Sequence, residues 1–364
     1  MGPQERSSLR QKVGAIVYDL PRFLWAMRPL AGAPWVNFRN RNERLIPGKL
    51  DNGVACDWQW TSDLHIAKVF PGLGRVLMKR ALRDWPIVSR DEPAAQEARA
   101  PLDLSFIIGH RGKERLPHLL ATLRSIASQR GVSFECIVVE QSAAQEVKDL
   151  LPSWVRYTHT QLPYANMPYS RAWAFNVGAR GARGRVLVLH DNDMLAPIYY
   201  GKEVIARFND GYDVMNLKRF IFYLSESDSS RTLSAGALTT DGAPVAVMQN
   251  ALGGTIGISR DAYFAIGGFD ESFVGWGGED NEFWERAETR SCWQYGYLPF
   301  VHLWHAAQEG KLREGRSTAR LLDERSAIPA SDRIAELAAR DFGNPRSSLV
   351  VDPSSVAGQQ SCAE

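Results

Sequence analysis

From residue 102 onwards, apolar residues follow two distinct patterns. Short continuous apolar runs at 102–109, 134–140 and 186–190 predict buried strands. Between the first two runs, leucine and isoleucine recur every three or four residues over positions 116–126, which predicts an amphipathic helix. This order of strand, helix and strand is typical of a parallel sheet wrapped by helices, so we predict an α/β fold.

The same patterns predict further elements downstream. Helices are expected at 169–178, 202–208, 260–266 and 282–287, strands at 213–217 and 252–259, and a polar loop at 225–231. Residues 1–100 show no clear periodic run, but their five tryptophans favour an ordered extension. We therefore predict three parts: an N-terminal extension of unknown role (1–100), a main α/β domain (101–310), and a C-terminal helix with a loose tail (311–364).

Composition narrows the class of protein. The 364 residues are 45% hydrophobic and 23% charged, which is ordinary for a folded protein, and a net charge of +2 gives no sign of a nucleic-acid partner. The apolar runs are too short for a membrane span, and the first is broken by charged residues, unlike a signal peptide. Four widely spaced cysteines favour a reducing compartment. A cytoplasmic location is therefore expected.

One N-terminal segment leaves two interpretations open. Residues 23–30 are apolar and aromatic, and Arg39, Arg41 and Arg44 follow at a short distance. Such a segment can rest on the inner face of a membrane as a peripheral anchor. A helix packed against its own domain gives the same pattern, and it is the more common case.

Polar residues follow the predicted strands where each strand ends. Gly109, His110 and Arg111 come after the first strand, and Glu140 ends the second. Ligands of parallel sheets bind at these carboxyl ends, and basic residues there suit a phosphate-bearing ligand. A few basic residues in a solvated loop give the same signal.

Asp191 and Asp193 follow the third strand with one residue between them. Alternate residues of an extended segment point the same way, so both carboxylates can face one Mn²⁺ or Mg²⁺ ion. His302 and His305, late in the domain, are further candidate metal ligands. A solvated acidic turn and two structural histidines are the alternatives.

The most unusual stretch is 267–282, where glycines flank Trp276 and precede Glu279 and Asp280. A tryptophan between glycines suggests a mobile aromatic platform, and a carboxylate beside it can act as a general base. The alternative is structural, since carboxylates often occupy the first turn of a helix.

Together these motifs resemble a nucleotide-sugar glycosyltransferase of the GT-A fold, a Rossmann-like α/β fold with a mostly parallel central sheet flanked by helices. Residues 102–310 look like a family 2-type domain whose C-terminal half resembles the β-1,4-galactosyltransferases. The motifs that carry the resemblance are Ile107 to Arg111, Tyr169 to Ala172 with Asn176 to Gly178, Asp191 to Asp193, Gly253-Gly254, and Gly267 to Asp280.

The resemblance implies roles for individual residues. It assigns the donor diphosphate to Arg111 and Arg171, with Asn176, Asp191 and Gly254 also in the donor site. It assigns the metal to Asp193, His305 and, where the family has methionine, His302. It assigns acceptor binding to Trp276, Gly278 and Glu279, and proton abstraction to the Glu279–Asp280 pair, with Asp280 as the base. Gly109-His110 stands where the family has proline and an aromatic residue.

The resemblance further implies inverting, metal-dependent transfer of galactose or N-acetylgalactosamine from a UDP-sugar to a glycan hydroxyl. A surface polysaccharide or a lipid-linked saccharide is the expected acceptor. Two alternatives remain open at this stage. One is a retaining enzyme similar to the polypeptide N-acetylgalactosaminyltransferases, and the other is a carbohydrate-binding protein of the same fold without activity.

Overall fold

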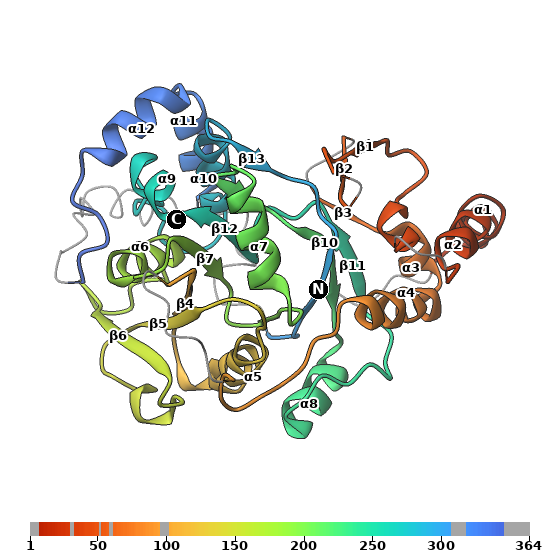
Figure 1. Cartoon of the computed structure of the whole chain (residues 1–364), viewed down its shortest axis with the longest axis horizontal. Coiled ribbons are helices and arrows are strands. Elements are labelled where there is room, and N and C mark those ends of the chain that lie inside the picture. The colour runs from red at the N-terminus through yellow and green to blue at the C-terminus, as the bar shows by residue number, and fades with distance from the viewer. Residues whose placement is uncertain are drawn as a thin grey trace, which may run out of the picture.

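The computed structural model of the chain describes residues 7–29, 33–50, 52–57, 61–94, 102–306 and 318–345. Its centre is a seven-stranded sheet with the strand order β13-β9-β12-β7-β4-β5-β6 (Figure 1). The strands are β4 (Leu104–His110), β5 (Phe134–Ser142), β6 (Val155–Gln161), β7 (Val186–His190), β9 (Val214–Met215), β12 (Thr255–Ser259) and β13 (Cys292–Trp293). Only β12 runs antiparallel to its neighbours among these described strands. The predicted fold class is confirmed.

Strand β4 illustrates why both faces of this sheet must be covered. Phe106 and Ile108 belong to one apolar cluster, while Ile107 between them belongs to a second. Successive side chains of a strand point to opposite faces, so a strand that is apolar throughout needs packing on both. Helices α5 (Leu116–Ala127) and α7 (Tyr200–Asn209) contribute to the first cluster, and helices α6 (Arg171–Gly181), α9 (Arg260–Ala265) and α10 (Glu279–Ala287) to the second.

A second sheet, which the sequence patterns did not predict, packs on the side of α5 and α7. Its strand order is β3-β11-β10-β14-β8. The strands are β3 (Ser62–Asp63), β8 (Met194–Leu195), β10 (Lys218–Tyr223), β11 (Ala246–Gln249) and β14 (Leu298–His302). Strand β10 pairs in parallel with β14, and β14 pairs antiparallel with β8. This sheet brings β14, near the end of the segment 102–306, beside the turn that follows β7.

The N-terminal extension shares a core with the segment 102–306. It contains α1 (Leu9–Gly14), α2 (Leu20–Ala26), β1 (Leu45–Pro47), β2 (Val54–Cys56), β3, α3 (His65–Val69) and α4 (Pro71–Asp84). Trp35 and Leu77 are fully buried in the same cluster as Phe106. Arg219, also buried, donates its Nε to the carbonyl of Val36 at 2.6 Å. The predicted boundary near residue 100 falls at 95–101, outside the described residues.

Three predictions about the elements need correction or qualification. The stretch 225–231 is not a loop but the start of α8 (Glu226–Ala235), because the Ser225 hydroxyl accepts a hydrogen bond from the Asp228 N–H at 3.1 Å and caps it. Residues 1–100 were expected to lack a periodic run, but residues 71–84 within them form an amphipathic helix, α4. The C-terminal segment holds two helices, α11 (Ala319–Ser326) and α12 (Ala330–Ala338), and most of the predicted tail, from 346 on, lies outside the described residues. No helix of the described residues has the length and hydrophobicity of a membrane span.

Candidate active site

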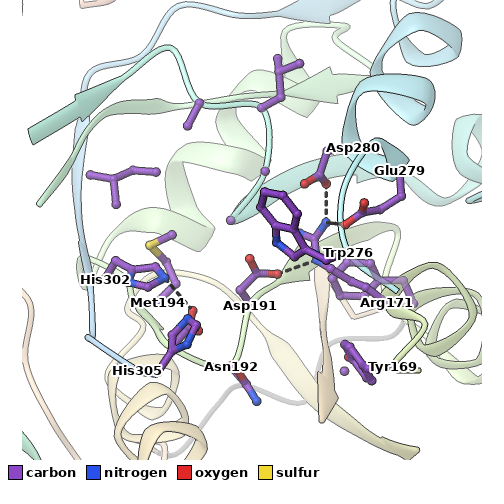
Figure 2. Close-up of a pocket in the computed structure, with 18 of the residues that line it drawn as sticks. Tyr169, Arg171, Asp191, Asn192, Met194, Trp276, Glu279, Asp280, His302 and His305 are labelled. Atoms are coloured by element: carbon purple, nitrogen blue, oxygen red, sulfur yellow. Dashed lines mark hydrogen bonds and ion pairs between the residues drawn. The ribbon is translucent and has the colours of Figure 1, made fainter. Parts of the chain in front are cut away.

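A cavity of about 450 Å³ opens at the carboxyl ends of β4 and β7, between the two sheets (Figure 2). Most of the predicted site residues line it, and they come from segments up to about 200 positions apart. They are Gly109, Arg111, Arg171, Asp191, Asp193, Gly254, Trp276, Glu279, Asp280, His302 and His305. Its volume is in the usual range for small-molecule sites, roughly 300–1,000 Å³.

Strand pairing brings the histidines to the acidic turn. Residue His302 is the register partner of Met194, and the N–H of Leu303 donates to the carbonyl of Asp193 at 2.9 Å. As a result, Nε2 of His302 lies 3.5 Å from Oδ1 of Asp193, and Nε2 of His305 lies 3.4 Å from Oδ2. One ligand atom from each of the three side chains lies within 4.8 Å of the others.

Asp193, His302 and His305, which we call the metal-type cluster, suit a divalent metal ion. Oδ1 of Asp193 is buried and accepts no hydrogen bond from the described residues. The His302 ring is held in place by stacking on Tyr223, with ring centres 4.4 Å apart. Burial alone would raise the pKa of Asp193, but His302, Arg115 and His305 together lower it to about 2, so the carboxylate stays charged. Two imidazoles and a carboxylate are donors that first-row transition metals accept.

Arg115 is a site residue that the sequence patterns did not single out. Its Nη2 donates to Oδ2 of Asp193 at 2.5 Å and to Oδ1 of Asn192 at 3.2 Å. Arg111, which was predicted to bind the diphosphate, is engaged elsewhere. Its guanidinium donates to the carbonyl and side chain of Gln141 and to the carbonyl of Met167, at 2.6–2.7 Å. Arg111 and Arg115 lie in the same basic turn, so their positions in the sequence do not indicate which of them contacts Asp193.

Arg171 connects Asp191, in the acidic turn after β7, to the predicted base Asp280. Its Nε donates to Asp191 at 2.7 Å and its Nη1 donates to Asp280. Burial opposes the charge of Arg171, but Asp191 and Asp280 outweigh burial and raise its pKa well above the usual value. The guanidinium also lies 4.7 Å over the ring of Phe175. A cation in this position can meet a phosphate if the ion pairs rearrange.

Glu279 and Asp280 begin helix α10, after Gly278, whose φ of +92° favours glycine. Burial, and then the charge of Asp280, raise the pKa of Glu279 to about 7, although Arg171 lies 3.7 Å from its carboxylate. The helix N-terminus favours negative charge. Glu279 is therefore able to exchange a proton near neutral pH.

Trp276 stands at the cavity mouth and is 42% exposed. Gly275 and Gly277 on either side have φ angles of +99° and +100°, which other residues rarely adopt. The N–H of Gly275 donates to the carbonyl of Tyr169 at 3.0 Å, and the Thr318 hydroxyl donates to the carbonyl of Trp276 at 3.2 Å. The tryptophan is thus carried by a glycine-flanked turn that is fixed on both sides.

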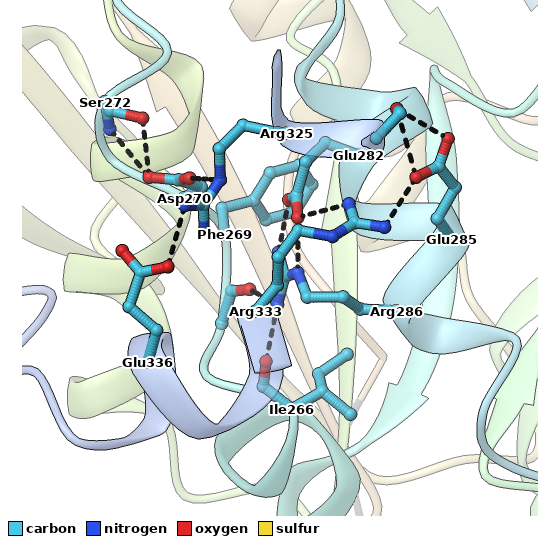
Figure 3. Close-up of polar contacts among 12 residues, drawn as sticks. Ile266, Phe269, Asp270, Ser272, Glu282, Glu285, Arg286, Arg325, Arg333 and Glu336 are labelled. Atoms are coloured by element: carbon cyan, nitrogen blue, oxygen red, sulfur yellow. Dashed lines mark hydrogen bonds and ion pairs between the residues drawn. The ribbon is translucent and has the colours of Figure 1, made fainter. Parts of the chain in front are cut away.

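Buried ion pairs hold helix α10 in place (Figure 3). Glu282 and Arg286 are completely buried and form two hydrogen bonds of 2.6–2.7 Å. Arg333 of α12 donates to Glu282 at 3.0 Å and to Glu285 at 2.7 Å. The C-terminal helices therefore help to set the position of the Glu279–Asp280 pair.

Four predicted site residues lie outside the cavity lining formed by the described residues. His110 is buried beside the Asn192 side chain, with 3.0 Å between their nitrogens, and burial lowers its pKa to about 4. The Glu140 carboxylate accepts from the Tyr157 hydroxyl at 2.5 Å and from backbone N–H groups. The Asn176 side chain accepts from Tyr263 at 2.6 Å and from the N–H of Phe269 at 2.9 Å, and Gly278 caps α10.

Comparison with known proteins points to one family. The family described as "N-terminal domain of galactosyltransferase" matches residues 246–296. Beta-1,4-galactosyltransferase 5 from Sus scrofa is 25% identical over 194 residues, and the proteins of that name from Mus musculus and Homo sapiens are each 24% identical. Each alignment covers 51% of this chain and 38% of the relative, so the chain spans well under half the length of these relatives.

Among solved structures, the chain is similar to the catalytic domain of Drosophila beta1,4galactosyltransferase 7 in complex with xylobiose. The TM-score is 0.39 at 13% sequence identity, and the match covers 63% of this chain and 83% of the Drosophila chain. The matched family segment, 246–296, contains Gly254, Trp276, Glu279 and Asp280. The sequence matches confirm the predicted resemblance: the chain carries a region similar to the β-1,4-galactosyltransferases.

Proposed function

We propose that this protein is an inverting, metal-dependent glycosyltransferase that moves a sugar from a UDP-sugar to a hydroxyl of a glycan. The observation that carries the proposal is that Asp193 and Asp280 line the same cavity, where Arg171 donates hydrogen bonds to both Asp191 and Asp280. A donor diphosphate at the metal-type cluster would then face a carboxylate that can take a proton. Trp276, at the mouth of the same cavity, offers a surface on which a sugar ring can stack.

Positive charges near Asp193 would stabilise the diphosphate leaving group. Asp193, His302 and His305 would hold the metal ion, which when bound supplies positive charge to the diphosphate. Arg115 and Arg171 are the nearby guanidiniums and can donate to phosphate oxygens as charge develops. Both are more than four-fifths buried, so their attraction is weakly screened by solvent.

Asp280 is proposed as the general base. The acceptor oxygen forms a bond to the anomeric carbon on one face while the bond to the diphosphate oxygen breaks on the other. UDP leaves with the bonding electron pair, and the hydroxyl proton passes to the Asp280 carboxylate. Glu279, at the start of the same helix, is proposed to bind the acceptor hydroxyls. A single base without a carboxylate nucleophile inverts the anomeric configuration.

Galactose or N-acetylgalactosamine is the proposed sugar, and the names of the relatives favour galactose. A surface polysaccharide or a lipid-linked saccharide is the proposed acceptor. Mn²⁺ is preferred over Mg²⁺ because two of the three candidate ligands are imidazoles. A cytoplasmic location stays a prediction.

The proposal can be tested with purified protein, Mn²⁺, and UDP-galactose or UDP-N-acetylgalactosamine, using glycan acceptors with free hydroxyls. We expect transfer that stops on chelation and resumes when Mn²⁺ is restored, and NMR of the product should show an inverted anomeric centre. A retained anomer would instead support the retaining mechanism. Binding of UDP-sugar without transfer to any acceptor would support a carbohydrate-binding protein, and full turnover in excess chelator would remove the metal from the proposal.

A further inference from the structure

The N-terminal helical segment, residues 9–26, exposes an unusual density of apolar side chains. It consists of α1, a π-helical turn (Ala15–Asp19) and α2 in direct succession, and it lies at the right edge of the molecule in Figure 1. Seven of the fifteen exposed large apolar side chains in the described part of the chain fall in these 17 positions, Leu9 to Trp25: Leu9, Val13, Ile16, Val17, Tyr18, Leu24 and Trp25.

Several of these side chains form one face. Val13 and Val17 follow Leu9 at steps of four residues, and Leu24 follows Val17 after seven, which are the spacings of neighbours on one side of a helix. Together with Ile16, these residues are 49–79% exposed, and we call them the apolar face.

A different side of the same segment attaches it to the protein. Ala15, Asp19, Phe23 and Ala26 are at most 4% exposed. Phe23 packs edge-on against Phe38, with ring centres 5.4 Å apart, and Oδ2 of Asp19 lies 3.2 Å from the His65 ring. The segment is therefore already anchored through its buried side, and its own packing leaves the apolar face in solvent.

The charges around the apolar face are basic. Between residues 7 and 29 there are four basic residues, Arg10, Lys12, Arg22 and Arg28, against one acid, Asp19, a difference of +3. Asp19 is 4% exposed, so its charge is turned inward. A helix with an exposed apolar face flanked by arginine and lysine fits a bilayer surface that carries anionic headgroups.

A pocket at the C-terminal end of the same helical segment strengthens this match. It has a volume of about 350 Å³ and is lined by Pro21, Arg22, Trp25, Ala26, Asn37, Phe38 and Arg39. Arg22 donates to the carbonyl of Arg39 at 3.1 Å, and Arg39 donates through its Nε to the carbonyl of Glu43 at 2.7 Å, so backbone oxygens hold both side chains in place. Two arginines and a tryptophan in one pocket lining suit a phosphate ester attached to an apolar chain, because arginine recognises phosphate and tryptophan favours the bilayer interface.

We infer that the N-terminal helical segment docks on an anionic phospholipid bilayer, with the apolar face inserted among the acyl chains and Arg22 and Arg39 meeting lipid phosphates. The docking needs no nucleotide sugar and does not depend on the transfer reaction. It would keep the cavity close to acceptors carried by lipid.

Vesicle flotation with the full chain tests this inference. The probes are vesicles of phosphatidylcholine alone and vesicles of an equal mixture of phosphatidylcholine and phosphatidylglycerol. We expect flotation with the mixed vesicles, weakened by salt, and little with phosphatidylcholine alone. The triple variant Ile16→Ser/Val17→Ser/Leu24→Ser should bind at least about tenfold more weakly, and Arg10→Gln/Lys12→Gln about fivefold more weakly per charge removed.

Matched controls use exposed residues elsewhere. Leu150→Ser removes an exposed apolar side chain, and Arg290→Gln/Lys148→Gln removes two exposed charges, so neither should change flotation. Circular dichroism and transfer to a soluble acceptor check that each variant is folded, independently of lipid binding. Equal flotation of the triple variant and the unchanged protein would overturn the inference. So would a lipid-free dimer that the triple variant dissociates, because the apolar face would then pair with a second copy.

Discussion

Arg171 donates a hydrogen bond from its Nη1 to Oδ1 of Asp280, the residue proposed to take the acceptor proton. The same guanidinium holds Asp191 through its Nε at 2.7 Å. One oxygen of the proposed base is thus engaged by a cation that is also proposed to face the diphosphate. When phosphate oxygens compete for Arg171, the Asp280 carboxylate can turn to the acceptor, so donor binding would prepare the base for the second substrate.

Replacing Asp280 by Asn tests the base directly. Asparagine keeps the shape and can still accept a hydrogen bond from Arg171, but it cannot take up the acceptor proton. We expect kcat to fall roughly 10²- to 10⁴-fold, while the affinity for UDP with Mn²⁺, measured by calorimetry, changes little. Unchanged turnover in Asp280→Asn would remove this residue from the mechanism.

Gly253 offers a way to disturb Asp280 without replacing it. A Cβ at Gly253 would collide with Oδ2 of Asp280, the carboxylate oxygen that Arg171 does not engage. Gly253→Ala should therefore lower kcat while UDP binding is largely retained. Gly72→Ala is the matched control, because a Cβ there has open space within α4 and a helical alanine is favourable. Equal kcat values for the two variants would mean that Asp280 adjusts freely.

Much of the central sheet follows from local pattern, whereas the second sheet does not. The run Val186–His190 predicts β7 with the observed bounds, because five residues are too few for a typical helix and two aspartates end the apolar run sharply. Strand β10 pairs with β14 about 80 residues later, and no local signal specifies that partner. For the same reason, residue type made His302 a candidate metal ligand, but only the family resemblance assigned it to the same metal ion as Asp193.

Some individual side chains of the cavity could be predicted from their place in the sequence. The Trp276 turn has a single tryptophan among glycines, and it does line the cavity. Asn176 was assigned to the donor site only through the family resemblance, yet its side chain binds the backbone of Phe269. Hydrogen-bond partners of this kind depend on the folded arrangement of distant segments.

The raised pKa of Glu279 predicts a dependence of stability on pH. Its usual value is 4.5, and burial raises it to about 7 in the folded protein. The folded state therefore binds the proton more tightly than the unfolded state. The resulting stabilisation is complete below about pH 4.5 and is lost as pH rises through about 7.

Between pH 6 and pH 8 we expect the free energy of unfolding to fall by on the order of 1 kcal/mol through Glu279. Urea titrations of Glu279→Gln should show a flatter profile over this range, because glutamine does not ionise. Glu324→Gln, an exposed control, should keep the profile of the unchanged protein. Parallel profiles for all three proteins would contradict the assignment.

The buried network under α10 should be sensitive to the loss of one partner. Arg333 is 3% exposed and binds Glu282, which is completely buried. Arg333→Leu leaves Glu282 with Arg286 alone, so we expect a loss of about 3 kcal/mol of unfolding free energy, the lower end for breaking a buried ion pair. Arg320→Leu removes a pair with Glu324 in which Arg320 is 92% exposed, and it should have no measurable effect. Similar unfolding curves for both variants would show that the network contributes little.

Arg115 and a metal ion should compete for the same carboxylate. The Nη2 of Arg115 lies 2.5 Å from Oδ2 of Asp193, which is also the oxygen nearest to His305. Arg115→Gln removes the competing cation, so Mn²⁺ binding without nucleotide, followed by electron paramagnetic resonance, should strengthen roughly threefold to tenfold. UDP binding in the presence of saturating Mn²⁺ should weaken by a similar factor, because a phosphate-facing charge is lost. If Mn²⁺ and UDP binding weaken together, Arg115 supports the metal ligands and does not compete with the ion. Arg124→Gln, which removes a half-exposed arginine paired with the exposed Asp91, should change neither affinity.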